Sequence, residues 1–136
     1  MEKLFPCILG LQMMEILKTR GDIRAQLGKT MGTDDFYEGQ ARLDGALKPS
    51  YTEDDKMAFL RRAHGAGVRN IEMESTAFAA FCLRAGIPAA DVCTTLLDRL
   101  QGDQVTSTPA ELAQFSDNAQ RVVLQYIRGQ LKKVAT

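Results

Sequence analysis

The clearest indication of the fold is GVRNIEMESTAFAAFCLRAGI, residues 67–87. Its first part, 68–73, is short and mostly apolar, which predicts a buried β-strand. From Glu74 to Ala85 the apolar side chains recur at the spacing of one helix face, and a glycine and a proline follow, so a helix is expected there. A strand that leads directly into a helix is typical of an α/β protein in which part of the sheet is parallel.

The segments on either side continue this alternation of helices and strands. Helices are expected over 12–20, from Thr52 to the glycines at 65 and 67, and over 117–133; strands within 23–33 and over 89–97; and loops over 34–50 and 98–109. The sequence therefore predicts an α/β fold with a mixed sheet flanked by helices.

Composition excludes several classes of function. The chain has 136 residues, 45% of them hydrophobic, and its 17 basic and 17 acidic side chains cancel. Nucleic-acid binding is not expected, because it normally requires a clustered basic excess. No run approaches the roughly 20 apolar residues of a membrane span. Three widely spaced cysteines (Cys7, Cys82 and Cys93) and one histidine, His64, predict no metal site, and they favour a reducing, cytoplasmic compartment. Cys82 and Cys93 are expected to be buried.

The loop over 33–45 carries polar side chains suited to an imide. In an extended loop Gln40 and Arg42 would leave the same face. The glutamine amide can accept from a ring N–H and donate to one carbonyl, while the guanidinium donates to another. Gly39 would allow close approach of the backbone, and Phe36 could stack on the ring. From the residues alone, a polar surface turn remains the alternative.

The junction after the strand at 68–73 forms a second candidate site. Ligands of open α/β sheets lie beyond the carboxyl ends of strands. A carboxylate of Glu72 or Glu74 can accept hydrogen bonds from the vicinal hydroxyls of a ribose, and Met73 can pack under the sugar. The alternative is that Glu74 is only a helix N-terminal acid and Met73 only a core residue.

Three blocks together resemble the uridine phosphorylases, within the nucleoside phosphorylase family. They are GKTMGTDDFYEGQARLDGAL (28–47), AGVRNIEMES followed by FAAFCLRAGI (66–87), and VCTTLLDRLQGDQV (92–105). The resemblance implies reversible phosphorolysis of uridine to uracil and ribose 1-phosphate, with phosphate as co-substrate and without a cofactor.

The resemblance also implies roles for individual residues. Gln40 and Arg42 would bind uracil and act in catalysis, with Phe36 against the base. Met73 and Glu74 would hold the ribose, and Glu72 would contribute mainly through its backbone. The remaining substrate-binding residues would be an apolar wall, Leu96 and Leu97, and Arg99, which would reach the base through solvent.

The resemblance further implies that residues 28–136 form the C-terminal part of the phosphorylase domain, preceded by a divergent segment, 1–27. The phosphate-binding half of the site would be absent, and the fold incomplete. A cytoplasmic homodimer or higher homo-oligomer is expected. Two alternatives stay open: an inactive, shortened phosphorylase that binds nucleosides or other subunits, and an interaction module built on the C-terminal helix, 117–133.

Overall fold

The computed structural model describes residues 8–18 and 22–134. Its elements, in chain order, are α1 (Ile8–Leu17), β1 (Lys29–Gly32), the 3-10 helix η1 (Glu38–Gln40), α2 (Glu53–Gly65), β2 (Val68–Glu72), α3 (Ser75–Ala85) and α4 (Pro109–Val134).

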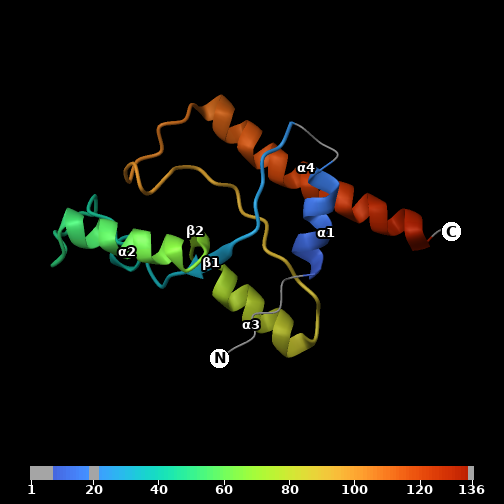
Figure 1. Ribbon diagram of the computed structural model, residues 1–136, viewed down its shortest axis with the longest axis horizontal. Helices are drawn as coiled ribbons and strands as arrows, with labels where there is room; N and C mark the ends of the chain where they lie inside the picture. Colours follow the sequence, from blue (N-terminus) through green and yellow to red (C-terminus); the bar gives the residue numbers. More distant parts are fainter. Residues whose placement is uncertain (1–7, 19–21, 135–136) are drawn as a thin grey trace.

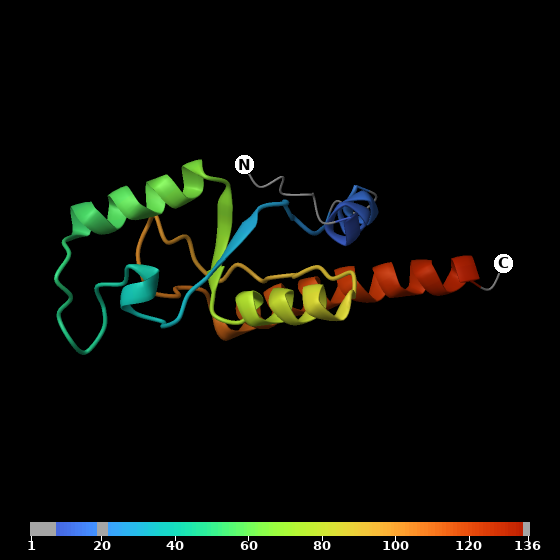
Figure 2. The same ribbon diagram turned by 90° about the horizontal axis from the view of Figure 1, so that it is seen from below.

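The two strands form the centre of the fold. β1 and β2 pair in parallel, with Gly32 opposite Glu72, and the chain crosses from one to the other through α2. α2 contacts β2 and α3 contacts β1, and the strand pair lies between these helices in both views (Figure 1; Figure 2). The α/β class is therefore confirmed. Within the described residues the sheet has these two parallel strands, so the antiparallel pairing of the expected mixed sheet is not seen.

The helix expected after Thr52 is confirmed, together with its cap. The Thr52 hydroxyl accepts a hydrogen bond from the Asp55 N–H, and the Asp55 carboxylate accepts one from the Thr52 N–H in return. This reciprocal pair satisfies two of the N–H groups that a helix start leaves unpaired. The hydrogen bonds from Thr52 also lower the pKa of Asp55. α3 ends at Gly86, which has a φ of 66°, a conformation that glycine adopts without strain.

The last helix begins earlier than the sequence analysis predicted. It starts at Pro109 rather than near Asp117. Thr108 and Glu111 form the same reciprocal pair of hydrogen bonds as Thr52 and Asp55, and proline suits the first helical position. α1 packs across this helix (Figure 1), and Leu17 and Val122 are buried there.

Two further boundary predictions need correction. The N-terminal helix begins at Ile8 instead of Gln12 and ends at Leu17, while its expected stop at residues 19–21 lies outside the described residues. The strand expected over 89–97 is not formed. Among the described residues, no backbone–backbone hydrogen bond involves residues 90–97. Because a strand exists only when it is paired, β-forming residues without a partner strand stay irregular.

Much apolar surface remains uncovered. The accessible surface is 10283 Å², whereas a compact monomer of 15.0 kDa has roughly 7,000 Å². Exposed side chains include Phe81 and Leu83 on α3, and Leu131 on α4. A search of the described helices for one long and apolar enough to cross a membrane finds none.

Candidate functional site

The loop after β1 is ordered by one aspartate. The carboxylate of Asp35 accepts hydrogen bonds from the Tyr37 N–H and the Gly39 N–H, both at 2.8 Å. The chain then turns through η1, and Ala41 adopts a left-handed conformation with a φ of 53°. The expected extended loop is therefore wrong, because side-chain hydrogen bonds fold it into a tight turn. Gln40 and Arg42 are nevertheless both buried, whereas residues 34–38 of the same turn are exposed.

Arg42 is held by contacts on several sides. Its guanidinium carbon lies 4.1 Å from the centre of the Phe36 ring, the geometry of a cation–π contact. Its Nη1 donates to the backbone carbonyl of Asp103 at 2.5 Å and lies 3.5 Å from the Asp44 carboxylate. The Tyr51 hydroxyl donates to the Arg42 carbonyl at 2.6 Å. One face of Phe36 is thus occupied by Arg42, and stacking on a base stays a prediction for the rest of the ring.

Asp103 lies at the centre of a buried charged cluster that the sequence analysis missed. Its carboxylate accepts hydrogen bonds from Lys56 Nζ and Arg99 Nε, each at 3.0 Å, and from the Leu43 N–H at 3.2 Å. Arg99 Nη2 donates to the Gln40 carbonyl at 2.8 Å. We call this group, Gln40, Arg42, Lys56, Arg99 and Asp103, the Asp103 cluster.

Ionisation in the cluster follows from these contacts. Burial alone would raise the pKa of Asp103, but the hydrogen bonds from Lys56 and the Leu43 N–H, with the charge of Arg99, lower it overall. Burial would likewise lower the pKa of Lys56, and its hydrogen bonds to Asp103 and Glu53 raise it instead. Both groups are therefore charged at neutral pH. The pKa of Tyr51 is raised by burial and then by nearby carboxylates, so its hydroxyl stays a donor.

Two guanidinium N–H groups in the cluster have no acceptor. Within the described part of the chain, Arg42 Nε and Arg99 Nη1 are buried and make no hydrogen bond. A buried donor left unpaired costs about 1–3 kcal/mol. An oxygen acceptor brought by a ligand would offset this cost, although neither nitrogen is accessible in this conformation. Arg99 was expected to act through solvent; its other nitrogens are instead bound to Asp103 and Gln40.

One sequence feature, the position of Lys56 on the apolar face of α2, could have pointed to the Asp103 cluster. Lys56 and Leu60 are four residues apart on one face of α2, and both are buried. A lysine on the apolar face of a helix needs a buried counter-charge. The sequence does not say which carboxylate provides it.

At the junction between β2 and α3, the carboxylates of Glu72 and Glu74 have different hydrogen-bond partners. Glu72 caps α3: it accepts from the Glu74 N–H and the Ser75 N–H, both at 2.6 Å, and from the Ser75 hydroxyl. Burial would raise the pKa of Glu72, and these hydrogen bonds lower it overall. Glu74 occupies the N-cap position of α3 but makes no side-chain cap hydrogen bond, so both the ribose-binding role and the alternative of a helix N-terminal acid stay predictions. Met73 is 40% exposed, which excludes a core role.

The loop after β1 and the junction after β2 both begin at the carboxyl end of the parallel strand pair. Gly32 and Glu72 are paired at the carboxyl ends of the two strands. The next residue along, Thr33, donates to the Glu72 carbonyl through its N–H at 2.9 Å and through its hydroxyl at 3.3 Å. The backbone of Glu72 therefore joins the two segments. This is the position at which open α/β sheets bind ligands.

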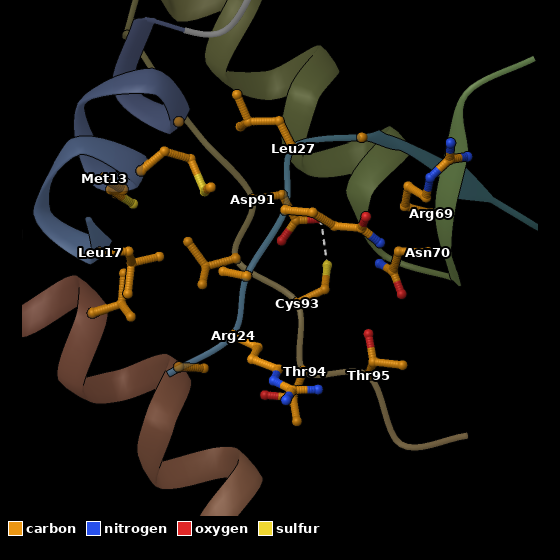
Figure 3. A pocket seen from close by; sticks show the side chains of 18 of the residues that line it. Met13, Leu17, Arg24, Leu27, Arg69, Asn70, Asp91, Cys93, Thr94 and Thr95 are labelled. Atoms are coloured by element: carbon orange, nitrogen blue, oxygen red, sulfur yellow. Dashed lines mark hydrogen bonds between the residues drawn. The ribbon is translucent and has the colours of Figure 1, made fainter. Parts of the chain in front are cut away.

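Two described cavities lie elsewhere. One of about 500 Å³ lies between α1, the chain before β1, residues 91–95 and α4, and Figure 3 shows it from Met13 and Leu17 to Cys93. A second, of about 520 Å³, lies between α3 and residues 87–91. Neither cavity is lined by any of the predicted site residues, which are Phe36, Gln40, Arg42, Glu72, Met73, Glu74, Leu96, Leu97 and Arg99. Leu96 is 43% exposed, and its role as an apolar wall stays a prediction.

The cysteines were predicted only in part. Cys82 is buried as expected, but Cys93 is exposed, because residues 90–97 are not covered by a paired strand. Cys93 Sγ lies 3.2 Å from the Asp91 carboxylate (Figure 3). Although the residue as a whole is exposed, partial burial of its sulfur, with the neighbouring Asp91, raises the pKa of Cys93 to about 12. A search of the described residues for clusters of three or more metal-binding side chains finds none, and Cys7 lies outside them.

Comparison with known proteins places the chain in a family. Residues 9–128 match the family model of the phosphorylase superfamily. The chain belongs to this superfamily. Its relatives include mouse uridine phosphorylase 1, which is 57% identical over 105 residues, and a uridine and thymidine phosphorylase of Caenorhabditis elegans, which is 53% identical over 108. These alignments cover 77% and 79% of the chain, but 33% and 36% of the relatives.

Solved phosphorylase structures have the same fold. A structure from work on two uridine phosphorylases of Phytophthora capsici superimposes with a TM-score of 0.82 at 47% identity, covering 90% of this chain and 41% of that one. The uridine phosphorylase of Schistosoma mansoni in complex with thymine gives 0.83 at 34% identity, covering 87% and 42%.

The resemblance to uridine phosphorylases is thereby confirmed, and the chain spans about a third of the length of the curated relatives it matches. The family match begins at residue 9, inside the segment set apart as divergent, and the division at residue 27 stays a prediction.

Proposed function

We propose that this chain provides the uracil- and ribose-binding part of a uridine phosphorylase, which reversibly converts uridine and phosphate into uracil and ribose 1-phosphate. The observation that carries the proposal is the pair of buried, unpaired donors, Arg42 Nε and Arg99 Nη1, beside Gln40. The similarity to mouse uridine phosphorylase 1 gives the substrate class.

The donors act on the leaving group. In phosphorolysis a phosphate oxygen attacks the anomeric carbon of the ribose, the bond from that carbon to the uracil nitrogen breaks, and its electron pair goes to the uracil. Negative charge then spreads to the uracil oxygens. Fixed N–H donors of Arg42 and Gln40 stabilise this charge, and the loss of one such donor typically costs about 2.7–4 kcal/mol in the barrier.

Glu74 and Met73 hold the ribose. The Glu74 carboxylate accepts one long hydrogen bond, from the Met73 N–H at 3.3 Å, so it keeps acceptor capacity for vicinal hydroxyls. The cap provided by Glu72 supports this, because it leaves Glu74 uncommitted. The ribose then sits at the edge of the sheet from which the uracil-binding loop also departs.

The remaining parts of the reaction lie outside these residues. We infer that phosphate is the co-substrate and that no cofactor takes part, and we expect the phosphate-binding groups to lie outside the residues of this chain. We also infer a cytoplasmic, homo-oligomeric protein that acts in pyrimidine nucleoside salvage. The reduced cysteines, Cys82 and Cys93, support the compartment, and the exposed apolar surface supports assembly.

Calorimetric titration of the chain with uridine, with and without phosphate, tests the proposal. We expect saturable uridine binding that Arg42→Ala abolishes. Arg84→Ala, which removes an exposed arginine from α3, is the matched control and should leave binding unchanged. Absence of uridine binding to the wild-type chain would overturn the proposal.

A product assay under the same conditions separates two forms of this function. Release of uracil that depends on phosphate identifies a complete catalyst. Uridine binding without uracil release at any phosphate concentration identifies a nucleoside-binding phosphorylase part.

A further inference from the structure

Asp103 connects the segments that carry the base-binding groups. It is reached by Lys56 from α2, by Arg99 from the loop at 98–104, and by the Leu43 N–H from the chain after η1. Its own carbonyl accepts from Arg42 Nη1. One residue therefore joins two segments that are distant from it in sequence, at 42–43 and 56, to Arg99 in its own loop.

The carboxylate also offsets a concentration of positive charge. The side chains of Lys56, Arg42 and Arg99 are 4%, 6% and 11% exposed, and Asp103 is 8% exposed. Buried charges require a partner of opposite sign. Asp44, the other carboxylate near Arg42, is further away at 3.5 Å and is 26% exposed. Asp103 is thus the deeply buried anion among three buried cations.

The two unpaired donors belong to the arginines that Asp103 holds. Arg99 is fixed through Nε, which leaves Nη1 unpaired, and Arg42 is fixed through Nη1, which leaves Nε unpaired. A guanidinium is a rigid planar fork, so fixing one nitrogen sets the direction of the others. Together with the Gln40 carbonyl, which accepts from Arg99 Nη2, the Asp103 carboxylate sets the direction of Arg99 Nη1, and the Asp103 backbone carbonyl sets that of Arg42 Nε.

We propose that Asp103, fixed by Lys56, is a positioning residue for uracil: it aims the unpaired N–H groups of Arg42 and Arg99 at the base oxygens. This role rests on the proposed function. Asp103 does not touch the base, and it sets the preference of the site for a ring with two carbonyl oxygens over a ring with one.

The test compares uracil with two pyrimidines that each lack one of its carbonyl groups, pyrimidin-2-one and pyrimidin-4-one. Dissociation constants of all three are measured by calorimetry for the wild-type chain and for Asp103→Asn. We expect the wild type to prefer uracil and Asp103→Asn to reduce that preference about tenfold or more, the effect of losing one hydrogen bond to a charged group. Asp117→Asn, in an exposed ion pair with Arg121 on α4, should leave the preference unchanged.

A purely structural role gives a different pattern. If Asp103→Asn lowers the folded fraction alone, the affinity for all three rings falls by one factor, the preference is unchanged, and the proposal is overturned. If Asp103→Asn does not fold, Lys56→Gln serves instead, because it removes the cation that fixes the carboxylate. An unchanged preference in Lys56→Gln overturns the proposal equally.

An NMR measurement separates this inference from the proposed function. The Arg99 Nε–H signal should be protected from hydrogen exchange in the wild type and in Asp117→Asn, and unprotected in Asp103→Asn. If the wild-type chain binds no uracil, the proposed function fails, and the positioning of Arg99 is still decided by this signal. Equal protection in all three proteins would overturn the inference.

Discussion

The Asp103 cluster and the outer surface of α3 are held in opposite ways. In the cluster, charged side chains from three chain segments are buried and bound to one another. On α3, Phe81 and Leu83 are 69% and 84% exposed. This chain therefore orders the polar groups of its candidate site with its own residues, whereas its apolar surface lacks cover. The candidate base-binding groups can therefore be probed in this chain directly.

Among the substitutions that test this difference, Asp103→Ala is expected to lower the free energy of unfolding most. Removing the carboxylate leaves Lys56 and Arg99 as buried cations without their partner, a change that typically costs about 3–5 kcal/mol. Urea unfolding measures the loss in free energy of unfolding. Asp34→Ala, at an exposed aspartate of the loop after β1, should stay within about 0.5 kcal/mol of the wild type. Similar losses in both variants would mean that the cluster does not organise this region.

Acid should weaken the cluster before it affects the apolar surface. The pKa of Asp103 is lower in the folded chain than in the unfolded chain, so its stabilising contribution is present above the unfolded value of about 3.9 and is lost as pH falls through the folded value. The unfolding free energy should therefore decline below about pH 4, and less steeply in Asp103→Asn. Identical acid limbs for the two proteins in urea titrations would remove Asp103 as the cause. Lys56, with a raised pKa, limits stability only in the alkaline range.

A small effect on stability is expected from Phe81→Ser. Because this side chain is mostly exposed, its replacement should change the unfolding free energy by less than about 0.5 kcal/mol. It should lower concentration-dependent self-association, measured by sedimentation velocity, because exposed apolar patches promote association. A stability loss comparable to that of Asp103→Ala would show that the α3 surface is covered after all.

The smallest effect is expected at Cys93, and it concerns reactivity alone. With a pKa of about 12, this exposed thiol carries little thiolate at neutral pH and should react slowly with iodoacetamide. Asp91→Asn removes the neighbouring charge and should accelerate the reaction several-fold without a change in stability. A fast reaction in the wild type near pH 7.5, followed by mass spectrometry, would contradict the raised pKa.

Local patterns in the sequence predicted the helices and the paired strands. The cap at Thr52 and the strand-to-helix junction after Glu72 are short-range features, and both are found in the structure. The strand at 89–97 depends on a neighbour that a local pattern cannot specify, and it is not formed. Sequence patterns therefore predicted the helices, whose hydrogen bonds are local, and the two strands that pair with each other.

The residues of the candidate site were also predictable only in part from the sequence. Gln40, Arg42 and Glu74 carry chemistry that residue type alone suggests, whereas Asp103 could be recognised only as part of a turn. Its contact with Lys56 joins residues 47 positions apart, and its role depends on burial. Long-range pairing of buried charges is set by the tertiary fold, and no local spacing encodes it.

We predict that uracil binds at the loop carrying Gln40 and Arg42, and NMR of the isotope-labelled chain with added uracil is the measurement that decides this. The Gln40 and Arg42 amide signals should shift, and so should the Arg42 Nε–H signal as that donor gains an acceptor. Shifts confined to the cavity lined by Met13, Leu17 and Cys93 would place the ligand elsewhere and overturn the proposed function.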